Sequence, residues 1–141
     1  MQTTEQVFRA ELKKRGMRVT TNRLVILDCF ILFGRPLSVQ EIYQASAGKC
    51  NLTSIYRSVD SLTRSGVLRI VPRGFKNLYE LGEALWPHHH HVSCEYCGAT
   101  VSIDDERIER LIDELTQAAG FQPTRHDFEL FGLCEACRSK H

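Results

Sequence analysis

Apolar residues recur at helical spacing through the first 65 positions of the chain and predict four helices. A capping box formed by Ser38 and Glu41 marks the start of the third helix, and Gly66 ends the fourth. The break Gly34-Arg35-Pro36 separates the second helix from the third. The four predicted helices span about residues 5–15, 20–33, 38–47 and 53–65.

Two short runs of strand-forming residues follow the helices and predict a β-hairpin. The runs cover 67–71 and 77–81, and the turn between them carries Arg73 and Lys76. Helices followed by a hairpin with a basic tip are the pattern of a winged helix-turn-helix. Residues 1–82 are therefore predicted to form a winged-helix DNA-binding domain.

The fourth predicted helix has two different faces. An apolar stripe is formed by Ile55, Val59 and Leu62, at positions i, i+4 and i+7. The opposite face holds small hydroxyls and guanidiniums, which suit a helix in a DNA groove but also an ordinary solvated surface. The adjoining hairpin favours the groove. The residues of this face are Ser54, Tyr56, Arg57, Ser58, Ser61 and Arg64.

The pattern beyond position 82 predicts a hinge over 83–87 and a small α/β domain over 88–141. Strands are expected at 88–94, 99–103 and about 125–131, with an amphipathic helix between the second and third that ends at Gly120. The fold class is thus α+β. A unit of this size seldom forms a sufficient core alone and usually needs a metal or a partner.

Charge divides the chain in the same way. Residues 1–83 hold 13 Lys and Arg against 7 Asp and Glu, whereas residues 84–141 hold 5 against 10. A basic half indicates a polyanionic partner such as DNA. The sequence has no apolar run long enough to span a bilayer and no signal-peptide pattern, so no membrane association and a cytoplasmic location are expected.

Two CxxC pairs predict a zinc site. Cys94 and Cys97 form the first pair, and Cys134 and Cys137 follow 40 positions later. In a reducing compartment, thiols at this spacing typically hold Zn²⁺ as four thiolates. The site would connect both ends of the small C-terminal domain. Cys29 and Cys50 are expected to be a core residue and a loop residue.

Four consecutive histidines, His88 to His91, precede the first CxxC pair. Side chains of a strand alternate between its faces, so His88 and His90 are expected on one side and His89 and His91 on the other. A purification tag would lie at a terminus, which this run does not. Two metal sites are therefore predicted, and His126 is a plausible further ligand.

In these features the chain resembles the ferric-uptake-regulator family of metal-dependent transcription factors. The resemblance rests on Arg18-Val19-Thr20 with Arg23, on Thr53-Ser54-Ile55-Tyr56-Arg57, on Tyr79-Glu80, on the histidine run and on the two CxxC pairs. It implies an N-terminal winged helix, a small α/β dimerisation domain, and a homodimer that binds a palindromic operator when loaded with metal.

The resemblance also implies three groups of ligands. Cys94, Cys97, Cys134 and Cys137 match a structural zinc site; His88, His90, Glu109 and His126 match a second site; and Glu80, His89 and His91 match a sensor site at the hinge. The ferric type usually has Asp where His90 stands, whereas the zinc-responsive type can have His there.

The hinge site departs from the family pattern in three places. Pro36 stands where ferric and peroxide sensors supply a histidine, and Ser102 stands where the peroxide type has an acid. The cysteine that zinc sensors usually place near Gly82 is also missing. The fourth ligand of this site is left unassigned.

The hypothesis is a metal-responsive repressor of metal-uptake or metal-homeostasis genes. Thr53, Ser54, Tyr56 and Arg57 would contact the major groove of double-stranded operator DNA, and Arg18, Arg23 and Arg73 would bind phosphates. The structural ion would be Zn²⁺ and the regulatory ion Zn²⁺ or Fe²⁺, with Mn²⁺ a further option. The alternatives are a zinc-dependent or CxxC redox enzyme, and a metal-buffering protein without operator specificity.

Overall fold

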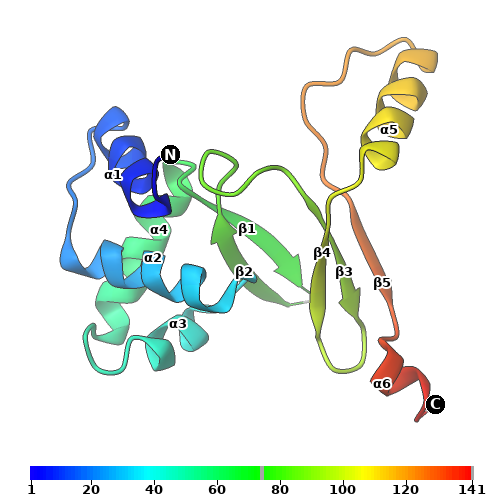
Figure 1. The fold of residues 1–141 in the computed structure, drawn as a ribbon. Coiled ribbons are helices and arrows are strands. Elements are labelled where there is room, and N and C mark those ends of the chain that lie inside the picture. The colour runs from blue at the N-terminus through cyan, green and yellow to red at the C-terminus, as the bar shows by residue number, and fades with distance from the viewer. Residues whose placement is uncertain (74, 141) are drawn as a thin grey trace. The chain divides into compact units, whose positions relative to one another are not determined.

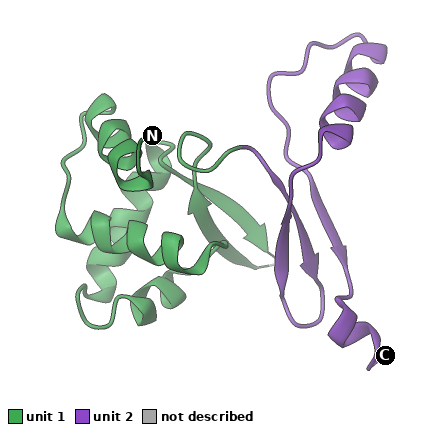
Figure 2. Ribbon diagram, in the orientation of Figure 1, with its two compact units in different colours: residues 1–87 green, residues 88–141 purple. Residues whose placement is uncertain are grey.

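The computed structural model describes residues 1–73 and 75–140, which form two compact units, Met1–Pro87 and His88–His141 (Figures 1 and 2). Gly74, in the predicted hairpin turn, and the terminal His141 lie outside the described residues. Within that described part, no helix combines the length and the apolar character needed to cross a membrane.

Each helix of the first unit starts at a polar capping residue. A side-chain oxygen at the cap accepts a hydrogen bond from a free backbone N–H of the first turn. Thr3 and Ser38 form complete capping boxes with Gln6 and Glu41. Asn51 caps the fourth helix, so this helix begins slightly before its predicted start. The helices are α1 Thr4–Lys14, α2 Thr21–Phe33, α3 Val39–Ala45 and α4 Leu52–Arg64.

The predicted hairpin follows as β1 Leu68–Arg73 and β2 Lys76–Leu81, paired antiparallel. An isolated bridge joins Leu37 to Tyr79 on the other side of β2, so β1 is the edge strand. Pro72 is therefore tolerated within β1, since a proline at an edge removes no internal ladder bond. This explains why the first strand extends beyond its predicted end.

The apolar faces of these elements form one core. The side chains of Phe8, Leu12, Ile26, Ile55 and Leu62 have no measurable exposure. Trp86, at the end of the unit, packs against the same cluster. A continuous core of this kind allows the unit to fold through hydrophobic burial without a metal.

The second unit is a three-stranded sheet with one long helix and one short helix. Its elements are β3 His90–Cys94, β4 Thr100–Ile103, α5 Glu106–Ala118, β5 Glu129–Gly132 and α6 Glu135–Arg138. The strand order is β4-β3-β5. β3 and β4 form an antiparallel pair joined by the first CxxC turn, whereas β3 and β5 are parallel, which requires the crossover through α5.

Two predicted strand starts in this unit are wrong. β3 begins at His90 instead of position 88, and β5 begins at Glu129 instead of about position 125, because the pairing of β3 with β4 and with β5 starts only there. The second CxxC pair begins a short helix, α6, that the sequence did not predict. Cys134 is its N-cap residue and Cys137 lies within it.

The apolar stripe of α5 is not buried within the unit. None of the described residues of α5 is buried, and Leu111 and Leu115 are 55% and 63% exposed. Val101 and Leu130, which flank Val92 on one face of the sheet, are also exposed, at 63% and 44%. Exposed apolar residues of this kind on a helix and a sheet are typical of an interaction site.

Candidate metal centres and nucleic-acid interface

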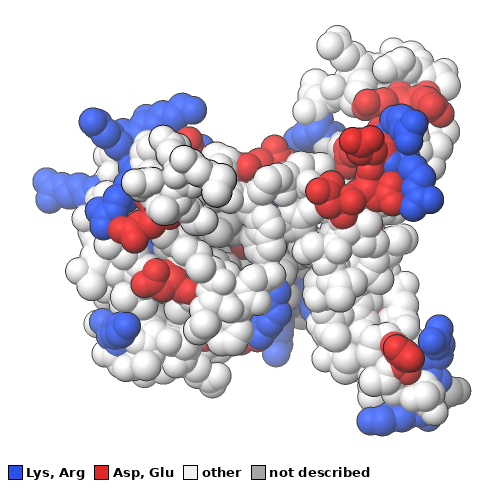
Figure 3. All heavy atoms as spheres, in the orientation of Figure 1, with Lys and Arg blue, Asp and Glu red and all other residues white. Residues whose placement is uncertain are grey.

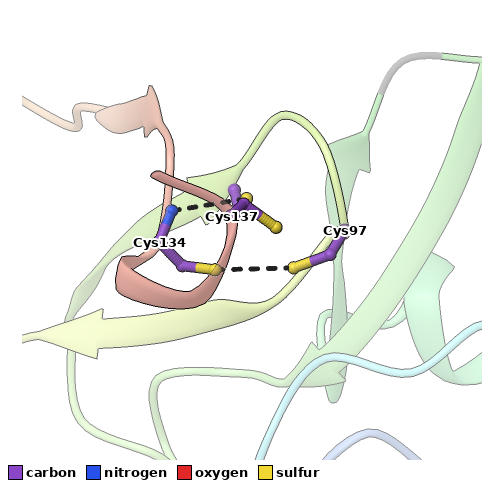
Figure 4. A group of neighbouring side chains, drawn as sticks. Cys97, Cys134 and Cys137 are labelled. Carbon is purple, nitrogen blue, oxygen red and sulfur yellow. Dashed lines mark hydrogen bonds between the residues drawn. The ribbon is translucent and has the colours of Figure 1, made fainter. Parts of the chain in front are cut away.

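The four cysteines of the CxxC pairs converge at one end of the second unit (Figure 4). Their sulfur atoms all lie within 4.8 Å of one another, and the Sγ atoms of Cys97 and Cys134 are 3.7 Å apart. Tetrahedral zinc with metal–sulfur bonds of about 2.3 Å puts neighbouring sulfurs about 3.8 Å apart. The geometry of the thiols therefore fits a four-thiolate zinc site.

The parallel pairing of β3 and β5 explains why the two pairs meet. Cys94 ends β3 and lies in register with Gly132 at the end of β5. Gly98 adopts a φ of 76°, a left-handed conformation that suits glycine, and its N–H donates to the carbonyl of Cys94 to close the first knuckle. Cys134 comes two residues after Gly132, at the cap of α6, so each strand ends directly in a ligand pair.

Hydrogen bonds stabilise the thiolate form of Cys94. The backbone N–H of Cys134 donates to Sγ of Cys94 at 3.4 Å, and this bond, with others from the first knuckle, lowers the Cys94 pKa to about 6. Burial and the neighbouring sulfurs act in the opposite direction on Cys137 and raise its pKa to about 12. A cation at this point would relieve the repulsion among the four sulfurs.

A second group brings together the three histidines His88, His90 and His126 with Glu109. Oε1 of Glu109 lies 2.6 Å from Nε2 of His90, and its Oε2 lies 3.0 Å from Nε2 of His126. The Nε2 atoms of His88 and His126 are 3.0 Å apart. Burial opposes ionisation of Glu109, but the hydrogen bond with His90 and the adjacent imidazoles lower its pKa below the ordinary value. Three imidazoles and one carboxylate suit a transition-metal ion.

Each ligand of this group comes from a different local structure. Glu109 lies in the first turn of α5, which Asp105 caps by accepting from the Arg107 N–H. His126 lies in the segment that leads into β5 and stacks on His90 with ring centroids 5.2 Å apart. Phe128 covers the other side of His90, edge to face at 5.4 Å.

The other two histidines of the run form a separate pair. The Nε2 atoms of His89 and His91 are 3.2 Å apart, and both residues are buried. Glu80, the third predicted ligand of the hinge site, belongs to the first unit, where it is buried and paired with Arg69. A site that joins Glu80 to the two histidines remains a prediction.

The residues predicted to contact the major groove lie on α4. Tyr56 is 51% exposed, Thr53 and Arg57 are exposed, and Ser54 is partly buried. Arg18 is also exposed, and Arg73, at the end of β1, is partly buried. Figure 3 shows basic side chains gathered over α1, whereas acidic ones, with a few basic ones among them, lie over α5.

Arg23 already has partners within the first unit. Its guanidinium donates to the carbonyl of Arg18 and to Oγ of Ser61 on α4, the latter at 3.4 Å. This arginine therefore connects the start of α2 to the predicted recognition helix. Arg64, at the end of α4, pairs with Asp60 at 3.1 Å.

Sequence reasoning missed the partner of Glu80. Arg69 lies directly opposite Glu80 in the hairpin register. Opposite charges on facing positions of an antiparallel pair attract each other, so the correct register would have revealed the pair. The register could not be predicted from the turn, because a turn of this length is compatible with several pairings of the two strands.

Comparison with known proteins agrees with this architecture. The model of the "Ferric uptake regulator family" matches residues 14–131. The ferric uptake regulation protein of Neisseria meningitidis is 28% identical over 140 residues, covering 93% of both chains. The peroxide operon regulator of Bacillus subtilis is 24% identical over 132 residues, covering 92% of this chain and 90% of its own.

A solved structure shares the fold over nearly the full length. The Helicobacter pylori ferric uptake regulator, described as having three functional metal binding sites, superposes with a TM-score of 0.83 at 24% identity. The match covers 97% of this chain and 95% of that one. The family match spans most of the chain, from α1 to β5. The chain thus belongs to the ferric uptake regulator family.

Proposed function

We propose that the protein is a metal-responsive transcriptional regulator that binds operator DNA as a metal-loaded homodimer and represses genes of metal uptake or metal homeostasis. The observation that carries the proposal is the combination of a winged-helix unit with a second unit that gathers two groups of metal-ligand side chains. Family membership makes a regulator the interpretation that accounts for both units.

Three roles are proposed for the ligands. The four thiols hold a structural Zn²⁺, which supplies the stability that the second unit lacks in its own core. His88, His90, Glu109 and His126 hold a second divalent ion. Glu80, His89 and His91 contribute to a sensor site for Zn²⁺, Fe²⁺ or Mn²⁺, whose filling favours the DNA-binding arrangement over others.

The proposed DNA contacts centre on α4. Tyr56 and Arg57 reach base edges in the major groove, Thr53 and Ser54 allow close approach of the helix, and Arg18 and Arg73 bind phosphates. Arg23 contributes a phosphate contact and also holds α2 against α4. Two copies are needed to read two half-sites about one helical turn apart.

A second copy of the chain is the proposed partner of the exposed apolar residues on the second unit. Leu111, Leu115 and Val101 are each more than half exposed. When the same surface of a second copy covers these residues, apolar area is removed from water on both copies. The protein is further proposed to act in the cytoplasm and to have no enzymatic activity.

The test is operator binding in four metal states. Duplexes selected from a randomised DNA pool are titrated with metal-free protein and with protein loaded with Zn²⁺, Mn²⁺ or, without oxygen, Fe²⁺. At least one metal is expected to tighten binding. Equal affinity in all four states contradicts a metal switch, and metal binding without any selected sequence favours a buffering role.

A matched pair of variants tests the interface. Arg57→Gln is expected to weaken binding to the selected operator by about 1–3 kcal/mol if the arginine reads a base. Arg9→Gln changes an exposed arginine of α1, outside the predicted recognition helix, that already pairs with Glu5, and its effect is expected to be small.

A further inference from the structure

Glu129 lies beside His91 in the sheet. In the parallel pairing of β3 and β5, His91 is in register with Glu129; in the antiparallel pairing of β3 and β4 it is in register with Ser102. Residues in register on neighbouring strands point to the same face. The imidazole of His91 is thus flanked at one level of the sheet by a hydroxyl on one side and a carboxylate on the other.

The carboxylate of Glu129 is poorly satisfied. Its Oε1 atom is buried and, among the described residues, has no hydrogen-bond partner. A carboxylate oxygen without a donor or a cation is costly to bury, and such an atom in a native fold calls for an explanation. Within the described part of the second unit, no other buried side-chain nitrogen or oxygen lacks a hydrogen-bond partner.

The histidine pair next to it needs negative charge beside it to hold a divalent ion. Nε2 of His89 and Nε2 of His91 are 3.2 Å apart and buried, so the two rings converge on one point. Two neutral imidazoles leave both charges of a divalent ion uncompensated. Glu80, in the first unit, has Arg69 on its Oε1 atom, which reduces the negative charge it can offer.

We propose that Glu129 is a ligand of the metal ion held by His89 and His91, an assignment that rests on the proposed sensor function of these histidines. Glu129 supplies from β5 the negative charge that the two imidazoles cannot. Two imidazoles and one carboxylate form a set that suits Fe²⁺ and Zn²⁺ and leaves coordination positions open for a ligand from the hinge.

Ligation requires a rotation of the Glu129 side chain. Its oxygens are not among the groups of ligand atoms that already lie within 4.8 Å of one another. Glutamate has three side-chain torsions, and two of them have staggered alternatives of similar energy. Because Oε1 has no hydrogen bond to break within the described part of the chain, the rotation costs little beyond the torsional change.

The experiment uses Co²⁺ as a spectroscopic probe in the full-length chain. The zinc at the four cysteines is retained, and His126→Ala removes the second site from the titration. In this background Glu129→Gln is expected to weaken Co²⁺ binding by about 10-fold or more, since even the loss of an outer-shell partner costs about 10- to 100-fold. Glu114→Gln, at an exposed acid of α5, is the matched control and is expected to leave the affinity unchanged.

A second variant moves the carboxylate to the opposite strand. Glu129→Gln combined with Ser102→Glu is expected to restore Co²⁺ affinity to within about 3-fold of the parent and to restore its visible absorption bands, because both positions flank His91. Unchanged affinity in Glu129→Gln overturns the proposal. So does a loss that Ser102→Glu fails to restore.

Stability of the chain that holds only the zinc of the four cysteines separates ligation from a structural role. Glu129→Gln removes a charge with a buried Oε1 atom while keeping the shape of the side chain, so this form of the variant is expected to unfold at a higher temperature than the same form of the parent. A lower unfolding temperature indicates a structural role and overturns the proposal. Operator binding is measured separately, so the Co²⁺ affinities test the role of Glu129 even if the regulatory function fails.

Discussion

Arg69 and Glu80 lie opposite each other in the hairpin, and the guanidinium of Arg69 pairs with a carboxylate that has no solvent exposure. The pair puts a fixed positive charge beside a proposed metal ligand. A metal ion that binds Glu80 must share the carboxylate with this arginine or replace it. If Glu80 ligates the ion, Arg69 is expected to raise the free metal concentration at which the proposed site fills.

Arg69→Gln is expected to destabilise the metal-free protein, because it removes the guanidinium that pairs with the buried carboxylate of Glu80. Loss of one partner of a buried pair costs about 3–5 kcal/mol, and the partial exposure of Arg69 places the expected effect at or below the lower end. Metal binding is expected to recover part of the loss, so the stabilisation by Zn²⁺ should be larger in the variant. Thermal unfolding with and without metal measures both effects; equal metal stabilisation in variant and parent would contradict the competition. Arg64→Gln, which breaks an exposed pair, is the control.

Cys134→Ser is expected to abolish the tightly held zinc of the second unit. The residue contributes one sulfur to the site and also the N–H that stabilises the Cys94 thiolate. Structural zinc contributes about 10–16 kcal/mol of apparent binding energy in small domains, so loss of a ligand should unfold this unit. Metal analysis and thiol titration provide the measurement. Cys50→Ser, which changes a buried thiol that donates to Asn22 at 3.2 Å in the first unit, should retain the zinc.

The surroundings of Glu41 predict that its contribution to the stability of the first unit is lost in acid. Burial raises its pKa, but the hydrogen bonds of the Ser38 cap and the Arg35 guanidinium outweigh this and hold the pKa below 4.5. A depressed folded-state pKa means that the stabilisation is complete above pH 4.5 and is lost as the pH falls through the folded value. Glu41→Gln keeps the capping box, so the gap in unfolding free energy between parent and variant should shrink below pH 4.5. Fluorescence of Trp86, the single tryptophan, follows the unfolding. A gap independent of pH would refute the assignment.

Arg18 and Arg23 are expected to differ when substituted by Gln. Arg18 is exposed, so its substitution should lower operator affinity and reduce the slope of log affinity against log salt by about 1, without loss of stability. Arg23→Gln should lower both affinity and stability, since the guanidinium bonds to Ser61 and to the Arg18 carbonyl. Binding isotherms at several salt concentrations, with urea unfolding in parallel, separate the two. Identical behaviour of both variants would contradict this division.

His90→Asp is expected to change the metal preference of the second site. It replaces one of three imidazoles by an oxygen ligand, and oxygen-rich sets favour Mn²⁺ and Fe²⁺ relative to Zn²⁺. The ratio of Zn²⁺ to Mn²⁺ affinity should fall by about 10-fold or more. Competition titrations measure the ratio. A ratio equal to that of the parent would show that His90 does not ligate the ion.

Local signals in the sequence were sufficient for much of this fold. Ser38 marked the start of the third helix because an N-cap acts within three residues, and the structure confirms this cap. The spacing of the cysteines predicted their convergence because CxxC is itself a local geometry. The α+β class followed from periodicity alone.

Features that depend on strand register could not be predicted. The Arg69–Glu80 pair and the position of Glu129 beside His91 both require knowing which residues face each other across a sheet. The short extent of β5 has the same origin, since a strand begins where its partner does. Residues 125–128 lie where His126 and Phe128 approach His90, outside the sheet.

The parallel pairing of β3 with β5 makes the folding of the second unit depend on contacts between distant parts of the chain. Contacts of the first unit are mostly between neighbouring helices and a hairpin, whereas Cys94 and Cys134 meet across 40 positions of chain. Closing so long a loop has an entropic cost that the small second unit recovers only when its ends are joined. We therefore expect zinc binding to the four cysteines to complete the folding of this unit, and a chain made without zinc to hold a folded winged-helix unit joined to an unfolded second unit.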